Sequence, residues 1–292
     1  MADATPTLPA GLQPGGRFDQ WRAPSVSWLA SDADGTLLGT DDQVTDAVAE
    51  AMVAVADRGV AVGIVTGRMR QGAERIHARL PVPGPHVLHN GAEVRLDGTT
   101  LVSWPLETQA VHTLLEIARE HRAYGEMYTS SGFTITRQDE RARDHWVSLE
   151  QYPTGISTVD DPPREPILKA TFIGFGPEES DRLEAAFDAA GLTVGSANSL
   201  AQPDRTYINV TSPGVTKARA ITAAADAIGI SPEAVAMIGD GRNDLPAFAL
   251  VGTAIAMGQA ADEIKDAAHL VTESVTADGV LVALHALGLL GG

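Results

Sequence analysis

The chain has 292 residues, 44% of them apolar, and a formal net charge of −17 at pH 7. It is long enough for two domains with separate cores, while its strong negative charge argues against nucleic acids and anionic membrane surfaces as partners. The chain has no cysteine, which excludes disulfides, zinc sites with cysteine ligands and phosphatases with a cysteine nucleophile.

Residues 1–24 begin the chain as an arm rich in proline and glycine. This arm is predicted to be flexible, although Trp21 suggests that it docks on the folded core. It lacks the basic and then apolar layout of a signal peptide, and no segment of the chain approaches the ~20 apolar residues of a membrane helix. A cytoplasmic location, with which the lack of cysteine is consistent, is expected.

After the arm, apolar segments typical of buried strands alternate with amphipathic helical segments. Strands are predicted at residues 26–31, 60–65 and 86–88, and helices at residues 44–58 and 69–79. Short connections between alternating strands and helices predict a parallel, doubly wound sheet of the Rossmann-like type.

From about residue 90 hairpins and helices are mixed, which predicts an inserted α+β domain over residues 90–210. A hairpin with a tight turn at Asp97-Gly98 begins this insert. The other predicted elements of the insert are helices at 107–122, 140–150 and 178–190 and strands at 125–129, 132–137, 167–175, 192–196 and 205–210. Residues 25–89 and 211–292 then form one α/β core. Its second part has predicted helices at 215–228, 244–251, 260–267 and from 277, and strands at 234–238 and 254–257.

Four polar motifs follow the predicted core strands or begin predicted helices. They are Asp32-x-Asp34-Gly35-Thr36, Thr66-Gly67-Arg68, Lys217 and Gly239-Asp240-x-x-Asn243-Asp244. Because the carboxyl ends of parallel strands meet at one edge of the sheet, where open α/β folds bind ligands, we expect the motifs to converge. Two carboxylates in one partly buried loop repel each other unless a cation lies between them, and Mg²⁺ meets that need. The motifs together predict a metal-assisted phosphate site.

Each motif alone has a simpler explanation. An isolated Asp-x-Asp-Gly is more often a solvated turn, and most lysines are solvated surface residues. Asp240 with Asp244 is equally typical of a helix start with an acidic first turn. A calcium loop of the EF-hand type is disfavoured, because Thr36 and Gln43 stand where that loop needs metal ligands. The prediction of a metal-assisted phosphate site therefore depends on the presence of all four motifs in this order.

In this order the four motifs resemble those of the haloacid-dehalogenase-like (HAD) phosphohydrolases, and most closely their Cof-type or class IIB branch, which carries a large α/β cap. His89-Asn90-Gly91-Ala92 is similar to the Asn-Gly-Ala step that leads into the cap in this branch. The resemblance covers about residues 28–287. One departure is Leu245-Pro246-Ala247-Phe248, where the branch usually has a methionine-leucine pair, and it should affect helix packing rather than chemistry. The resemblance implies a HAD core at 25–89 and 211–292 with a cap at 90–210.

The resemblance also implies a Mg²⁺-dependent phosphomonoester hydrolase in which Asp32 is the nucleophile and forms an aspartyl-phosphate. Asp34 is expected to be the general acid/base and to offer its backbone carbonyl to the metal. Asp240 is the expected second metal carboxylate, and Asp244 is expected to ligate directly or through water. The residues expected to bind phosphate are Thr66, Gly67, Lys217 and Asn243. The expected contacts with substrate or with the cap hinge are Arg68, Asn90 and Gly91.

The expected substrates are small phosphorylated metabolites, sugar phosphates above all. The cap offers a candidate substrate-facing cluster, which an exposed amphipathic helix explains equally well: Arg137, Arg141, Arg143, His145 and Trp146. A phosphosugar mutase stays open as an alternative because it shares the aspartyl-phosphate step. A non-catalytic phosphosugar-binding or regulatory protein would keep the fold but would tolerate loss of Asp32 or Asp34. A nucleotide-sugar glycosyltransferase uses a similar Asp-x-Asp, but it does not explain Lys217. The sequence does not predict the oligomeric state.

Overall fold

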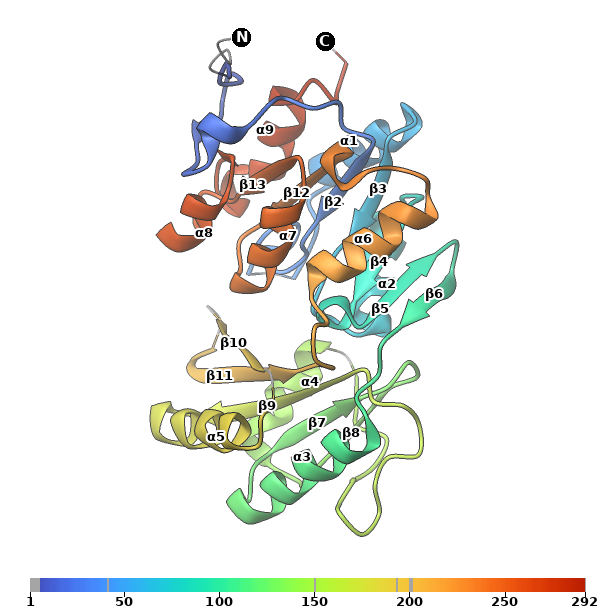
Figure 1. Ribbon diagram of the computed structural model, residues 1–292, viewed down its shortest axis with the longest axis vertical. Coiled ribbons are helices and arrows are strands. Elements are labelled where there is room, and N and C mark those ends of the chain that lie inside the picture. Colours follow the sequence, from blue (N-terminus) through green and yellow to red (C-terminus); the bar gives the residue numbers. More distant parts are fainter. Residues whose placement is uncertain (1–5, 41, 150, 193, 200–201, 292) are drawn as a thin grey trace. The chain divides into compact units, whose positions relative to one another are not determined.

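The computed structural model describes residues 6–40, 42–149, 151–192, 194–199 and 202–291 (Figure 1). The chain folds into two compact units. The core unit contains the described residues up to Gly67, Ala73–Val102 and those from Thr216 onward, and the cap unit contains Arg68–Gly72 and Ser103–Val215. In the described part of the chain, every helix is too short or too polar to span a lipid bilayer.

The core unit is built on a six-stranded sheet in the order β1-β14-β13-β12-β2-β3. All neighbouring strands from β14 to β3 are parallel, as predicted, whereas β1 at the edge is antiparallel. These strands are β1 (Gln13–Pro14), β2 (Trp28–Ser31), β3 (Ala61–Ile64), β12 (Val235–Gly239), β13 (Thr253–Ala256) and β14 (Leu270–Val271).

Helices cover both faces of this sheet, which confirms the doubly wound α/β prediction (Figure 1). Side chains of α1 and α9, among them Met52 and Leu284, join Leu29 and Ile238 of the strands in one buried apolar cluster. The helices are α1 (Asp46–Asp57), α2 (Arg70–Arg79), α6 (Lys217–Ala227), α7 (Leu245–Leu250), α8 (Asp262–Ala267) and α9 (Gly279–Ala286). Thr45 caps α1, because its side chain accepts a hydrogen bond from the backbone of Val48.

The predicted boundary of the insert at residue 90 differs from the structure. Strand β4 (His86–Leu88) pairs antiparallel with β5 (Glu93–Leu96), and β5 is followed by β6 (Thr99–Ser103) in a separate three-stranded sheet. The hairpin therefore belongs mostly to the core unit. Its pairing with β4 is a contact that the alternation of residues does not reveal. At the other end, the cap unit extends to Val215, whereas the predicted insert ends at residue 210.

The N-terminal arm, predicted to be flexible, is packed on the core in its described part. Strand β1 pairs with the edge strand β14. Trp21 is buried, and its Nε1 donates a hydrogen bond to Thr253 Oγ1 at 3.0 Å. Arg17 Nη1 donates to the carbonyl of Phe248 at 2.8 Å, in the last turn of α7. These contacts confirm that Trp21 docks, and they protect a sheet edge that would otherwise be unpaired.

The cap unit is an α+β fold with an antiparallel sheet in the order β10-β11-β9-β7-β8. Helices α3 and α5 contribute Leu114, Leu183 and Phe187 to an apolar cluster with Phe172 of the sheet. A second buried apolar cluster of this unit includes Tyr128 and Trp146. The elements are α3 (Thr108–His121), β7 (Gly125–Tyr128), β8 (Phe133–Ile135), α4 (Arg143–Leu149), β9 (Lys169–Phe175), α5 (Pro177–Ala189), β10 (Val194–Ser199) and β11 (Gln202–Val210).

Candidate functional site

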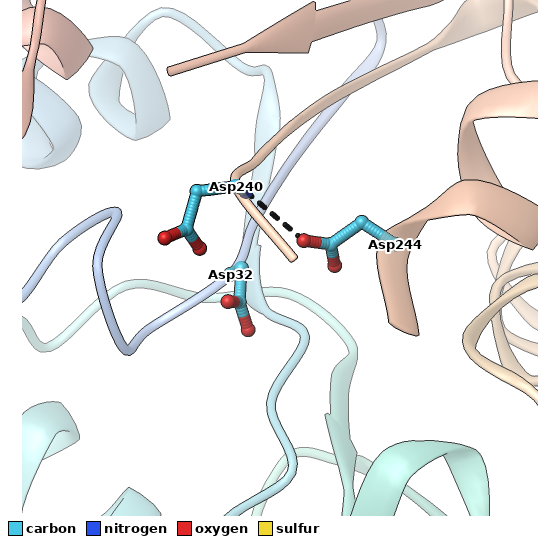
Figure 2. Close-up of side chains that lie close together, drawn as sticks. All are labelled: Asp32, Asp240 and Asp244. Atoms are coloured by element: carbon cyan, nitrogen blue, oxygen red, sulfur yellow. Dashed lines mark hydrogen bonds between the residues drawn. The ribbon is translucent and has the colours of Figure 1, made fainter. Parts of the chain in front are cut away.

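The two acidic loops meet because their strands are neighbours in register. Ile238 of β12 lies opposite Ser31 of β2, so Asp32 and Asp240 follow adjacent strand ends. One carboxylate oxygen from each of Asp32, Asp240 and Asp244 lies within 4.8 Å of the others. Figure 2 shows the three side chains gathered at this edge of the core sheet. The predicted convergence of the two acidic motifs is therefore present.

Lys217 lies between two of these carboxylates. It is the first residue of α6, whose N-cap is Thr216. Its Nζ donates hydrogen bonds to Asp32 Oδ1 at 2.7 Å and to Asp244 Oδ1 at 2.6 Å. The lysine is only 1% exposed, so both ion pairs are shielded from water. The predicted position of this lysine beside the acidic motifs is present in the structure.

Burial sets the protonation equilibria of this cluster. Burial disfavours the charge on Lys217, but the carboxylates of Asp244 and Asp32 outweigh it and raise the pKa of the ammonium group. Burial raises the pKa of Asp32 well above its usual range; the charge of Lys217 opposes this rise, and the neighbouring carboxylates add to it. Burial, with the charge of Asp244, raises the pKa of Asp240 to about 6. The cluster thus holds more negative charge than its one ammonium group neutralises.

Asp244 has hydrogen bonds to both of its carboxylate oxygens. Its Oδ1 accepts from Lys217, and its Oδ2 accepts from the backbone N–H of Asp240 at 3.1 Å and of Gly241 at 3.0 Å. A Cβ at Gly239 would lie 2.3 Å from Asp244 Oδ2, so only glycine fits there. Asp244 therefore fixes the loop that carries Asp240 and the position of Lys217.

The loop of Asp34 closes against Asp240. Gly35 has φ +75°, and a Cβ there would lie 2.1 Å from Asp240 Oδ2. Thr36 Oγ1 donates to Asp240 Oδ1 at 3.4 Å, while the side chain of Asp34 is exposed. Glycine thus lets this loop approach the second carboxylate closely, which explains why the motif needs Gly35.

Gln259 is a residue of this site that the sequence reasoning missed. Its Nε2 donates to the carbonyl of Gly35 at 2.5 Å, and its Oε1 accepts from the backbone N–H of Val275 at 3.0 Å. It therefore ties the Asp34 loop to the segment after β14. The available signal was its place just after β13, at the same sheet edge as the other motifs.

Thr66 and Gly67 lie beside Asn90 and Asn243. Thr66 is fully buried, and its carbonyl accepts from the backbone N–H of Asn90 at 3.1 Å. Asn243 Nδ2 donates to Asn90 Oδ1 at 3.1 Å. A Cβ at Gly67 would lie 2.7 Å from the same Asn90 oxygen. Arg68 belongs to the cap unit, so its contact with substrate stays a prediction.

The cap residues predicted to face substrate have partners within the cap unit. Arg141 Nη2 lies 2.7 Å from Asp139 Oδ2, and Trp146 Nε1 donates to the hydroxyl of Tyr124 at 2.6 Å. Arg137 and Arg143 form ion pairs with acidic cap residues, and His145 Nε2 lies 3.3 Å from Oε2 of Glu126. These contacts give the cluster a structural explanation, and its role in substrate recognition stays a prediction.

The donor set of the acidic cluster fits a hard divalent cation. All three potential ligands are carboxylates, which suit Mg²⁺. Because Asp244 already accepts three hydrogen bonds, Asp32 and Asp240 are the carboxylates best placed to hold the ion. The glycine at position 35, which allows the loop to lie against Asp240, fits the same interpretation.

Comparison with known proteins agrees with this geometry. The sequence model of the haloacid dehalogenase-like hydrolases matches residues 29–284. The putative phosphatase YxeH of Bacillus subtilis is 26% identical over 268 residues, which are 89% of this chain and 98% of YxeH. The 5-amino-6-(5-phospho-D-ribitylamino)uracil phosphatase YcsE of the same species is 25% identical over 264 residues, 89% of this chain and 95% of YcsE.

The fold is also found among solved structures. The HAD subclass IIB sugar phosphatase BT4131 superposes with a TM-score of 0.77 over 91% of this chain and 100% of that protein, at 19% identity. The family match, which extends over most of the chain, agrees with the parallel core sheet, the inserted α+β unit and the four motifs. The chain therefore belongs to the haloacid dehalogenase-like hydrolase family.

Proposed function

We propose that this protein is a Mg²⁺-dependent phosphomonoester hydrolase that acts through an aspartyl-phosphate on small phosphorylated metabolites, with sugar phosphates as the favoured class. One observation carries the proposal: the buried Asp32 carboxylate is held by Lys217 at 2.7 Å, and carboxylate oxygens of Asp240 and Asp244 lie within 4.8 Å. This arrangement combines a fixed nucleophile with an oxygen-rich site for a divalent ion.

Asp32 and Asp240, with the backbone carbonyl of Asp34, are the groups that would hold the metal. When bound, Mg²⁺ supplies the positive charge that offsets repulsion between the nucleophile and a phosphate dianion. The protein's overall charge of −17 makes such local positive charge necessary for any anionic substrate.

Asp32 would act through Oδ2, because Lys217 holds Oδ1. A bond forms between Oδ2 and phosphorus as the bond from phosphorus to the substrate alkoxide oxygen breaks. Asp34, exposed two residues further along the same loop, gives a proton to that alkoxide. It then takes a proton from the water that attacks the phosphorus of the aspartyl-phosphate. Inorganic phosphate leaves, and the carboxylate of Asp32 is restored.

Thr66, Gly67 and Asn243 would bind the oxygens of the transferring phosphoryl group, together with Lys217. Hydrogen-bond donors placed in advance where charge develops are an effective source of rate acceleration. We assign Asp244 a different role from the direct or water-mediated ligand predicted from the sequence. It would hold Lys217 and the loop of Asp240, since both of its oxygens already accept hydrogen bonds.

The substrate class rests on the relatives. YcsE is named for a phosphorylated ribitylamino compound, and the structural neighbour BT4131 is named a sugar phosphatase. Both names describe phosphate esters of small polyols or sugars, which favours the same class for this chain. The predicted cytoplasmic location and the predicted absence of nucleic-acid and membrane partners stay predictions.

A panel of phosphorylated metabolites, assayed for phosphate release with Mg²⁺ and with EDTA, tests the proposal. We expect hydrolysis of sugar or polyol phosphates that EDTA abolishes. Asp32→Asn should lower kcat by at least ~10⁴-fold with little loss in the urea midpoint, because Lys217 keeps its ion pair with Asp244. Asp57→Asn, at an exposed position of α1, should change neither. Sustained hydrolysis by Asp32→Asn would contradict the proposal. Isomerisation of a sugar phosphate without net phosphate release would indicate a mutase instead.

A further inference from the structure

We infer that Asn90 is a positioning residue that keeps the phosphate-binding groups of three separate loops in register. The inference rests on the proposed function, but its evidence is the hydrogen bonding and backbone conformation around Asn90. The sequence suggested a hinge or a substrate contact at this position. The structure places Asn90 inside the core unit, between two of the motifs, and both of those roles stay predictions.

The side-chain amide of Asn90 contacts two motifs at once. Its Oδ1 accepts a hydrogen bond from Asn243 Nδ2 at 3.1 Å. The same oxygen would lie only 2.7 Å from a Cβ at Gly67, so a side chain at that position would displace the amide of Asn90. Asn90 thereby fixes the distance between the loop after β3 and the loop after β12. These two loops are far apart in the sequence.

The backbone around Asn90 adds two further attachments. Its N–H donates to the carbonyl of Thr66 at 3.1 Å. The next residue, Gly91, has φ +104°, and a Cβ there would lie 2.3 Å from the carbonyl of Thr216, which precedes Lys217. The turn is thus pressed against the start of α6, where the lysine of the site begins its helix.

This arrangement needs an unusual backbone conformation. His89 and Asn90 have φ of 53° and 57°, in the left-handed region that residues with a Cβ rarely adopt. Asparagine tolerates this region better than most residues. His89 is fully buried, and its Nε2 lies 3.9 Å from Oε2 of the buried Glu93, whose Oε1 accepts from Thr100 Oγ1 at 2.6 Å. The turn therefore packs beside the start of the β5–β6 hairpin.

A shift of this turn would move the donors that receive the phosphoryl group. A displacement of about 1 Å in such a site can lower the rate by ~10²-fold. Because Asn90 is hydrogen-bonded to Asn243 and to the carbonyl of Thr66, its loss should act on kcat more than on KM. It should also make the amide of Asn243 dispensable, since that amide would no longer be held in place.

The test compares Asn90→Gly, Asn243→Ala and the double variant. Glycine readily adopts the left-handed backbone conformation, and the substitution removes the side chain that carries the amide. The matched control is Asp97→Gly, an exposed left-handed residue (φ 49°) in the β5–β6 turn. The measurements are kcat and KM for p-nitrophenyl phosphate, the urea midpoint, and the side-chain amide resonances of Asn243 in ¹⁵N spectra.

We expect Asn90→Gly to lower kcat by ~10²-fold with a urea midpoint like that of Asp97→Gly. The double variant should be no more than about twofold slower than Asn90→Gly alone, because coupled residues are not additive. Independent, multiplying effects of Asn90 and Asn243 would overturn the inference. A wild-type protein that hydrolyses no phosphate ester would contradict the proposed function alone. In that case, unchanged Asn243 amide resonances in Asn90→Gly would still overturn the positioning role, and a shift confined to that variant would support it.

Discussion

Replacing Lys217 by methionine should both inactivate and destabilise the protein. Methionine is unbranched and of similar length, so the substitution removes the charge while it fills most of the same volume. In the wild type the ammonium group hydrogen-bonds Asp32 at 2.7 Å and Asp244 at 2.6 Å in a buried setting. Without it, two buried carboxylates face each other with no cation from the protein between them.

The size of the loss follows from the geometry. Carboxylate oxygens of Asp32 and Asp244 lie within 4.8 Å. At an effective dielectric constant of about 20, two unit charges at that distance repel by ~3.5 kcal/mol. Removing one partner of a buried ion pair costs ~3–5 kcal/mol in general. We therefore expect Lys217→Met to lower the free energy of unfolding by about 3–5 kcal/mol at neutral pH.

This loss should shrink as the pH falls. The pKa of Asp32 is already raised in the folded protein, by burial first, and only the charge of Lys217 opposes that rise. Without the lysine, the folded state binds a proton at a pH where the unfolded chain does not. A lower pH then stabilises the folded state of the variant. The difference in free energy of unfolding between variant and wild type should therefore be smaller at pH 5.5 than at pH 7.5.

Urea unfolding in EDTA at these two pH values measures the effect. Lys265→Met, at a partly exposed position of α8, is the matched control and should stay within about 1 kcal/mol of the wild type. Adding Asp244→Asn to Lys217→Met removes one of the two carboxylates and should restore part of the stability. The reasoning is refuted if Lys217→Met is as stable as the control, or if Asp244→Asn restores nothing.

Two further predictions concern metal and pH. Mg²⁺ at 100 times its Kd should raise the wild-type free energy of unfolding by ~2.7 kcal/mol, and Asp240→Asn should lose most of that gain. An equal gain for the wild type and for Asp240→Asn, measured by urea unfolding, would contradict the metal role of Asp240. Burial lowers the pKa of His86 and of His269 to about 4, and Nδ1 of each accepts a backbone N–H, from Ile64 and Ala254. The contribution of these two neutral histidines to the free energy of unfolding is therefore complete above about pH 6.5. It is lost as the pH falls towards 4, by up to ~3 kcal/mol for each histidine. His86→Asn should flatten this decline in urea unfolding between pH 7 and 4.5, and an unchanged slope would contradict it.

The sequence was most informative where local pattern and topology coincide. The parallel strands β2 and β12 could be predicted from buried apolar runs, and their shared edge brought Asp32 and Asp240 together. Lys217 could be placed because it begins a helix directed at that edge. In each case one rule, that parallel strands end together, was enough to predict a contact between residues distant in sequence.

Features that depend on pairings between distant segments could not be predicted in this way. The docking of β1 requires knowledge that β14 is an edge strand. The assignment of the β5–β6 hairpin to the core depends on its pairing with β4. Likewise, the spacing of Asp244 after Asp240 predicts one helical turn, but not that both oxygens of Asp244 are engaged by hydrogen bonds. Such contacts come from tertiary packing, which local periodicity does not encode.

The raised pKa values and the proposed metal belong to one electrostatic argument. Burial, with the charge of neighbouring carboxylates, raises the pKa of Asp240 to about 6 and that of Asp32 well above its usual range. Carboxylates that retain protons in this way also attract a divalent cation, and protons and metal compete for the same oxygens. Mg²⁺ should therefore bind more tightly as the pH rises through about 6. The fall of activity on the acid side would then reflect this competition, so a higher Mg²⁺ concentration should move it to lower pH.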